Sequence, residues 1–126
     1  MPLVAIVTVL ALIQYVVQGV RVGQARQRYG VEAPATAGHA IFERHFRVHQ
    51  NTLEQLVIFL PAMWLFGWFV KGWIAALLGV VFIVARFIYE RGYVADPSQR
   101  EKGFMLTTIV NGVLLLGALI GALVHL

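Results

Sequence analysis

Apolar residues fill four long stretches of the chain, and polar residues separate these stretches at three places. About 20 apolar residues are needed to cross the roughly 30 Å of hydrocarbon in a bilayer. The first and last stretches meet that length directly, whereas the middle two reach it only if each helix includes polar turns at one end. The four stretches cover residues 2–20, 51–70, 73–89 and 103–126.

This pattern predicts an all-α, integral membrane four-helix bundle. A backbone in lipid must satisfy its own hydrogen bonds, so each stretch is expected to be helical throughout. Gly30, Pro34 and Gly38 indicate a loop between the first two helices, and Pro97 suits the first position of a new helix. We expect one domain, residues 1–126, with spans at about 2–28, 41–70, 72–92 and 98–126.

Composition supports a membrane protein and narrows the chemistry. The chain is 60% hydrophobic and only 13% charged, against about 25% charged in soluble domains. The absence of cysteine excludes disulfides, thiolate metal sites and a cysteine nucleophile. The four histidines show no metal-ligand spacing, so no metal is expected. Because the basic residues lie between apolar helices, the net charge of +4 favours anionic lipid or substrate and not nucleic acid.

The basic residues are distributed unevenly between the two ends of the predicted bundle. Of the 10 lysines and arginines, only Lys71 lies in the second connection. The others lie in or beside the first and third connections. Since cytoplasmic loops carry an excess of Lys and Arg, the polar end is predicted to face the cytoplasm, with both termini outside.

Two polar stripes are predicted at that end. Arg47, Asn51 and Glu54 lie four and then three residues apart, so they share one helix face. An ionised Glu54 inside the apolar region needs a partner or water. Arg86, Tyr89 and Tyr93 form a second stripe by the same spacing. We expect Arg86 to pair with Glu54, and the resulting cleft would suit a ligand with carboxylates and an amine.

Structural roles are possible for many of the same residues. Arginines and lysines at helix ends often extend to the interface as anchors, a role open to Arg21, Arg28, Arg44, Arg91 and Lys102. A Glu54–Arg86 pair could simply hold two helices together, and Trp64, Trp68 and Trp73 suit an aromatic belt at the outer interface. Periodicity alone therefore leaves a transporter, a binding protein and an enzyme open.

Two longer motifs resemble one known family. Residues 42–54 carry the pattern Phe-Glu-Arg-x-x-Arg-x-x-x-Asn-x-x-Glu, and residues 85–93 carry Ala-Arg-x-x-Tyr-x-x-Gly-Tyr. Both resemble the MAPEG family, the membrane-associated proteins in eicosanoid and glutathione metabolism, and the likeness covers nearly the whole chain. The resemblance implies a homotrimer that holds glutathione at its subunit interfaces near the cytoplasmic face. It implies that glutathione is contacted by Arg26, Arg47, Asn51, Glu54, Arg86, Tyr89 and Tyr93.

The resemblance also assigns a catalytic role to Arg100, beside the thiol of glutathione. A free thiol has a pKa of about 8.5, and a neighbouring guanidinium lowers it by favouring the thiolate. The expected function is a membrane-bound glutathione transferase of the bacterial microsomal type. It would conjugate glutathione to lipophilic electrophiles and reduce lipid hydroperoxides.

This chain departs from the leukotriene-forming members at Gln27, His49 and Gln55, which argues against an eicosanoid substrate. Its short loops and nearly uncharged termini resemble bacterial members, so we expect it in a bacterial inner membrane. Two alternatives remain: a non-catalytic lipid-binding scaffold of the same family, and a small proton-coupled exporter with Glu54 as its intramembrane carboxylate.

Overall fold

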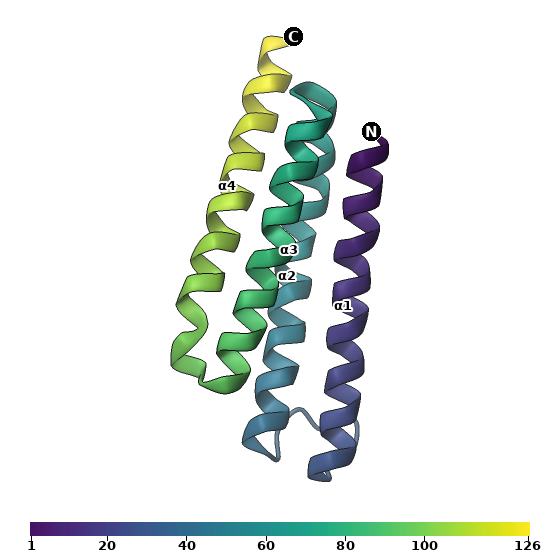
Figure 1. The fold of residues 1–126 in the computed structure, drawn as a ribbon, viewed down its shortest axis with the longest axis vertical. Coiled ribbons are helices and arrows are strands. Elements are labelled where there is room, and N and C mark those ends of the chain that lie inside the picture. Colours follow the sequence, from purple (N-terminus) through teal and green to yellow (C-terminus); the bar gives the residue numbers. More distant parts are fainter.

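The protein is a bundle of four long antiparallel helices with no strand. The computed structural model describes residues 1–126, and Figure 1 shows the helices running up and down with both termini at one end. All four are long and apolar enough to cross a membrane, which confirms the predicted fold class. The elements are α1 (Pro2–Tyr29), α2 (Ala40–Phe69), α3 (Gly72–Ala95), the 3₁₀ turn η1 (Pro97–Arg100) and α4 (Glu101–Val124).

Local sequence signals explain where the helices begin and end. Gly30 closes α1 in the left-handed region, with φ at 68°, and its N–H bonds to the carbonyl of Arg26. The ring of His39 accepts a hydrogen bond from the Ile41 N–H at the start of α2. Asp96 accepts one from the Ser98 N–H as η1 begins, and this bond holds the pKa of the Asp96 carboxyl below its usual range. Pro97 is the first residue of η1, as predicted.

The helices α2 and α3 form the centre of the bundle, with α1 packed on one side of them and α4 on the other. The rings of Phe59 and Phe82 stack with centroids 3.8 Å apart in the core. A Cβ on Gly79 would lie 2.5 Å from Val7, and one on Gly117 would lie 2.3 Å from Phe66. Small residues therefore let neighbouring helices approach closely, as is usual for packing in lipid.

Apolar side chains cover most of the outer surface of the bundle. Many large ones are exposed, Trp68 at 75% and Val57 at 67% among them. Trp73 is also exposed, whereas the Trp64 indole N–H donates to the Thr8 hydroxyl at 2.9 Å. Trp64 thus links α2 to α1 through a hydrogen bond.

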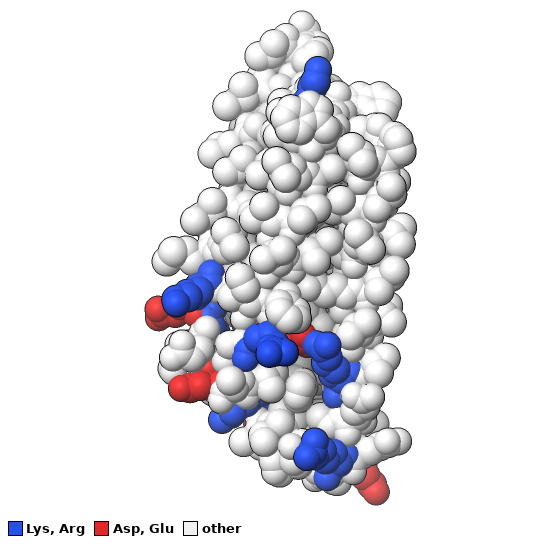
Figure 2. Space-filling model, in the orientation of Figure 1, with Lys and Arg blue, Asp and Glu red and all other residues white.

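Charged side chains gather toward one end of the molecule, as Figure 2 shows. That end, here called the polar end, contains the α1–α2 connection and the α3–η1–α4 corner. Lys71 lies at the other end, at the N-cap position of α3. Both predicted stripes therefore lie at the polar end, one toward the start of α2 and the other toward the end of α3.

Candidate functional site

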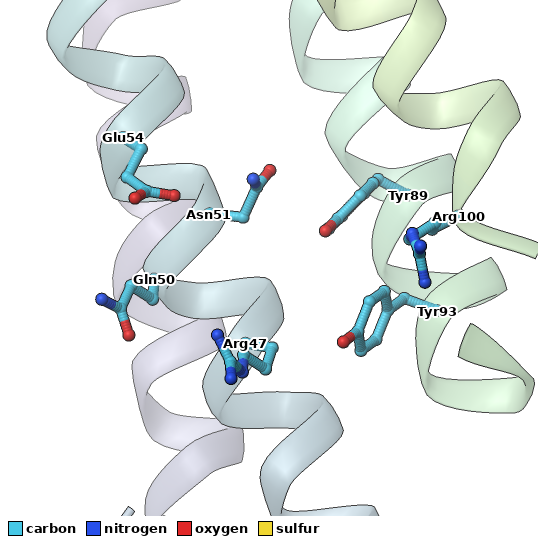
Figure 3. Close-up of a pocket in the computed structure, with 7 residues that line it drawn as sticks. All are labelled: Arg47, Gln50, Asn51, Glu54, Tyr89, Tyr93 and Arg100. Carbon is cyan, nitrogen blue, oxygen red and sulfur yellow. The ribbon is translucent and has the colours of Figure 1, made fainter. Parts of the chain in front are cut away.

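A polar cavity opens at the polar end, between α2 and the α3–η1 corner. Its volume is about 310 Å³, within the range of small-ligand sites. In Figure 3 the Asn51 side chain on α2 and the Tyr89 side chain on α3 point toward one another across the opening. The cavity is lined by Arg47, Gln50, Asn51, Glu54, Tyr89, Tyr93 and Arg100.

The α2 wall consists of the predicted stripe and one residue that the sequence analysis missed. Arg47, Asn51 and Glu54 share the cavity face, as their spacing requires. Gln50 lies on the same wall. It stands three residues after Arg47 and four before Glu54, so the same spacing argument could have found it. The wall therefore offers one cation, one carboxylate and two amides.

The opposite wall consists of Tyr89, Tyr93 and Arg100. Tyr89 is only 4% exposed, and the two tyrosine rings lie 5.6 Å apart between centroids. The Arg100 guanidinium is exposed and donates to the carbonyl of Pro97 at 3.2 Å. Figure 3 shows Arg100 beside the two tyrosines on the same side of the cavity. Arg100 thus adds a second cation to the cavity.

Two glycines allow the sharp corner that brings Arg100 to this wall. A Cβ on Gly103 would lie 2.5 Å from the Tyr89 backbone, and one on Gly92 would lie 2.6 Å from the Gln99 carbonyl. Any side chain at either position would push α4 or η1 away from α3. Arg44 strengthens the corner, because its guanidinium donates to the Val94 carbonyl at 3.0 Å and thereby caps α3.

Arg86 does not pair with Glu54, so that prediction was wrong. The Arg86 side chain is fully buried at 0% exposure and points into the bundle and not toward the cavity mouth. It donates to the Asn51 Oδ1 at 2.7 Å, and to the hydroxyls of Thr52 and Thr107. Its hydrogen-bond partners are thus neutral oxygens, and its Cζ also lies 4.3 Å from the centroid of the Tyr89 ring.

Through this contact Arg86 orients one residue of the cavity wall. Asn51 is the only cavity residue among the hydrogen-bond partners of Arg86. With its Oδ1 held by the guanidinium, the Asn51 amide keeps its Nδ2 free as a donor toward the cavity.

The buried carboxylate of the bundle is Glu90 and not Glu54. Glu54 is exposed at the cavity, where water can solvate its charge. Glu90 is 5% exposed and forms the only ion pair in the structure, with Arg21. Arg21 was considered as an interface anchor, yet it neutralises a buried acid on another helix. The two residues are 69 positions apart, so helical spacing could not predict that they pair.

Arg26 lies outside the cavity formed by its own chain. Its guanidinium donates to the Ala35 carbonyl at 2.7 Å, in the α1–α2 connection. The Arg26 Cζ also lies 4.7 Å from the centroid of the Phe42 ring. Within one subunit, the structure therefore does not bring Arg26 together with Arg47 or Arg100.

The cavity is chemically suited to a zwitterionic ligand with an excess of carboxylates. Arg47 and Arg100 can bind carboxylate or thiolate groups, Glu54 can bind an ammonium, and the amides and phenols can donate or accept hydrogen bonds. No group of three or more His, Asp or Glu side chains could hold a metal ion. The charged and hydrogen-bonding groups of the cavity suit an organic anion.

Comparison with known proteins identifies the family. The sequence profile of the MAPEG family matches residues 4–120. The chain belongs to the MAPEG family. It is 44% identical over 119 residues to an uncharacterised protein of Synechocystis, covering 94% of this chain and 87% of that one.

Two MAPEG relatives have names that state an activity. The chain is 39% identical over 121 residues to human microsomal glutathione S-transferase 2, covering 96% of this chain and 80% of the human protein. It is 32% identical over 123 residues to leukotriene C4 synthase of Rattus norvegicus, covering 98% of this chain and 82% of the rat enzyme. The resemblance inferred from residues 42–54 and 85–93 is therefore confirmed.

Proposed function

We propose that this MAPEG protein is a membrane-bound glutathione transferase that binds glutathione in the cavity and activates it as a thiolate. The observation that carries the proposal is the set of groups that the cavity brings together: Arg47 and Arg100, Glu54, and the amides and phenols between them. The similarity to microsomal glutathione S-transferase 2 supports the same conclusion.

Glutathione matches this set of groups. It carries two carboxylates, one ammonium and one thiol, so it needs at least one cation for the acids, an anion for the amine and a further cation for the sulfur. Arg47 and Asn51 would bind carboxylate, and Glu54 would bind the ammonium. Tyr89, Tyr93 and Gln50 would complete the hydrogen bonds of the tripeptide, with Arg86 acting through Asn51.

Arg100 would stabilise the thiolate. A shift of one to two units below the free thiol pKa of about 8.5 would make a large share of the bound glutathione reactive near neutral pH. Arginine stays protonated, so Arg100 would act electrostatically and not as a general base. The thiolate would form a carbon–sulfur bond with a lipophilic electrophile as its leaving group departs. With a lipid hydroperoxide, two glutathiones would give the disulfide, an alcohol and water.

The proposal includes a homotrimer whose sites lie between subunits. Arg26 lies outside the cavity of its own chain, yet the family resemblance gives it a glutathione contact. A neighbouring subunit could supply the Arg26 side chain to the open side of the cavity. The abundance of basic residues at the polar end favours a cytoplasmic location for these sites, in a bacterial inner membrane.

Mixed trimers test the shared site directly. We expect Arg26→Ala and Arg100→Ala subunits to be nearly inactive alone but to regain activity when co-expressed. A closed trimer that contains both kinds of subunit has one site of three with both arginines intact, so the doubly tagged oligomer should show about one third of wild-type activity. Conjugation by the co-purified, doubly tagged oligomer is the measurement. A mixture no more active than its components would contradict a site shared in this way.

The proposed activity itself is tested with purified wild-type protein. We expect saturable glutathione binding, conjugation to a chlorodinitrobenzene-type electrophile and turnover of lipid hydroperoxides. Steady-state rates with several electrophiles and peroxides are the measurement. Inactivity with all of them would exclude the transferase, and lipid binding without saturable glutathione binding would favour a scaffold instead.

A further inference from the structure

A groove between α1 and α3 carries basic side chains that the proposed reaction does not use. Two adjoining cavities form it, with volumes of about 410 and 290 Å³. Arg21 and His45 line both of them, so the two cavities are neighbours in one depression of this face. The larger cavity extends to Arg91 on α3, and the smaller one extends to Arg28 on α1. We call this depression the α1–α3 groove.

The groove has an excess of positive charge. Its one acid, Glu90, is 5% exposed and is already neutralised by Arg21. Arg28 and Arg91 are exposed and make no side-chain hydrogen bond or ion pair. Each guanidinium only lies over a ring of its own helix, Arg91 at 5.5 Å from the Phe87 centroid and Arg28 at 5.8 Å from that of Tyr29. Two cations therefore remain available to an anionic ligand.

Exposed apolar side chains lie one or two helical turns from the groove-lining residues, toward the middle of the bundle. On α1, Val17 and Val20 are 41% and 54% exposed, and on α3, Val84 is 48% exposed. The Arg21–Glu90 pair shows that the two helices are side by side at this level. Both helices thus change from exposed apolar to basic residues at about the same depth, and Figure 2 shows charged side chains gathered toward this end of the molecule.

We propose that the α1–α3 groove binds an anionic phospholipid. The headgroup phosphate would lie in the larger cavity beside Arg21 and Arg91, Arg28 would add positive potential from the smaller one, and an acyl chain would follow the valines toward the bilayer centre. Guanidinium groups bind phosphate oxygens through paired N–H donors, and basic pockets between membrane helices suit such headgroups. The inference does not depend on the proposed transferase activity.

Competition between two lipids tests this site. Full-length protein in a nonionic detergent would receive equal amounts of phosphatidylglycerol and phosphatidylcholine with the same acyl chains, and native mass spectrometry would count the lipid retained. We expect about tenfold preference for phosphatidylglycerol. The R28Q/R91Q variant should lose this preference, since it removes both free cations without breaking an ion pair. Lys71→Gln, which removes one charge at the opposite end, should keep it.

Several outcomes would overturn the lipid site. Equal retention of the two lipids by wild-type protein would show that the groove does not select anionic headgroups. Unchanged preference in R28Q/R91Q would place the bound lipid elsewhere, and loss of preference in Lys71→Gln would indicate net charge instead of a site. Displacement of phosphatidylglycerol by an equal concentration of inorganic phosphate would show a free-anion site. Thermal unfolding followed by helical circular dichroism checks that each variant has folded.

Discussion

Replacing Arg100 with alanine is expected to lower kcat/KM for conjugation about 30-fold to 100-fold at pH 7, because the bound thiol loses its stabilising charge. The wild-type rate should level off near neutral pH, where the bound thiol is already ionised. The Arg100→Ala rate should keep rising to about pH 8.5, the range in which free glutathione ionises. The pH profile of kcat/KM and the ultraviolet absorbance of bound thiolate are the measurements.

The controls for this prediction come from the same corner of the molecule. Arg100 is exposed and donates only to the Pro97 carbonyl, so its removal should leave the fold intact. Lys102→Ala removes a nearby exposed cation that does not line the cavity, and it should retain the wild-type profile. An unchanged pH profile in Arg100→Ala would remove the catalytic role from Arg100. An equal loss of kcat/KM in Lys102→Ala would indicate that the summed positive charge of the corner, and not Arg100 alone, stabilises the thiolate.

Arg86→Met is expected to weaken glutathione binding about tenfold, because Asn51 loses the charged hydrogen bond that orients its amide. The decisive measurement is the dissociation constant of glutathione for Arg86→Met, Asn51→Ala and the double variant. If Arg86 acts through Asn51, the double variant should bind no more weakly than Asn51→Ala alone. Rates at saturating glutathione should change much less than the binding constant.

Thr107→Val provides a matched comparison. It removes one hydrogen-bond partner of Arg86 on the side away from Asn51, so binding should weaken less than in Arg86→Met. Losses that add in the Arg86→Met and Asn51→Ala double variant would instead indicate that Arg86 contacts glutathione directly. Methionine can fill the space of the buried arginine, so we expect Arg86→Met to stay folded. Thermal unfolding of each variant then shows whether weaker binding comes from a displaced Asn51 amide or from an unstable bundle.

Much of the cavity could be predicted because its residues follow helical spacing. Arg47, Asn51 and Glu54 share a face by periodicity alone, and the structure places all three on one wall. Gln50 obeys the same rule, but a neutral amide carries no charge that would mark it as a candidate site residue. Arg100 was singled out by family resemblance, since periodicity has no bearing on a residue beyond a helix break.

Pairing between helices was harder to predict. Arg86 and Glu54 were expected to meet because their helices are neighbours, but periodicity specifies the face of a residue only approximately and the end point of a long side chain not at all. Arg86 turns to Asn51, Thr52 and Thr107 inside the bundle. The Arg21–Glu90 pair was missed for the same reason, since its partners are 69 residues apart.

The four-helix membrane bundle, its polar end and its family could all be inferred from the order of residues alone. Those properties depend on apolar length, charge distribution and local motifs, which the linear order of residues contains. The partners of the polar groups, in contrast, became clear only from the packed bundle. It assigned Arg86 to Asn51, Glu90 to Arg21 and an open cavity to Glu54. The physical reason is that helix rotation and close packing at glycines determine side-chain partners, and these depend on contacts between distant segments.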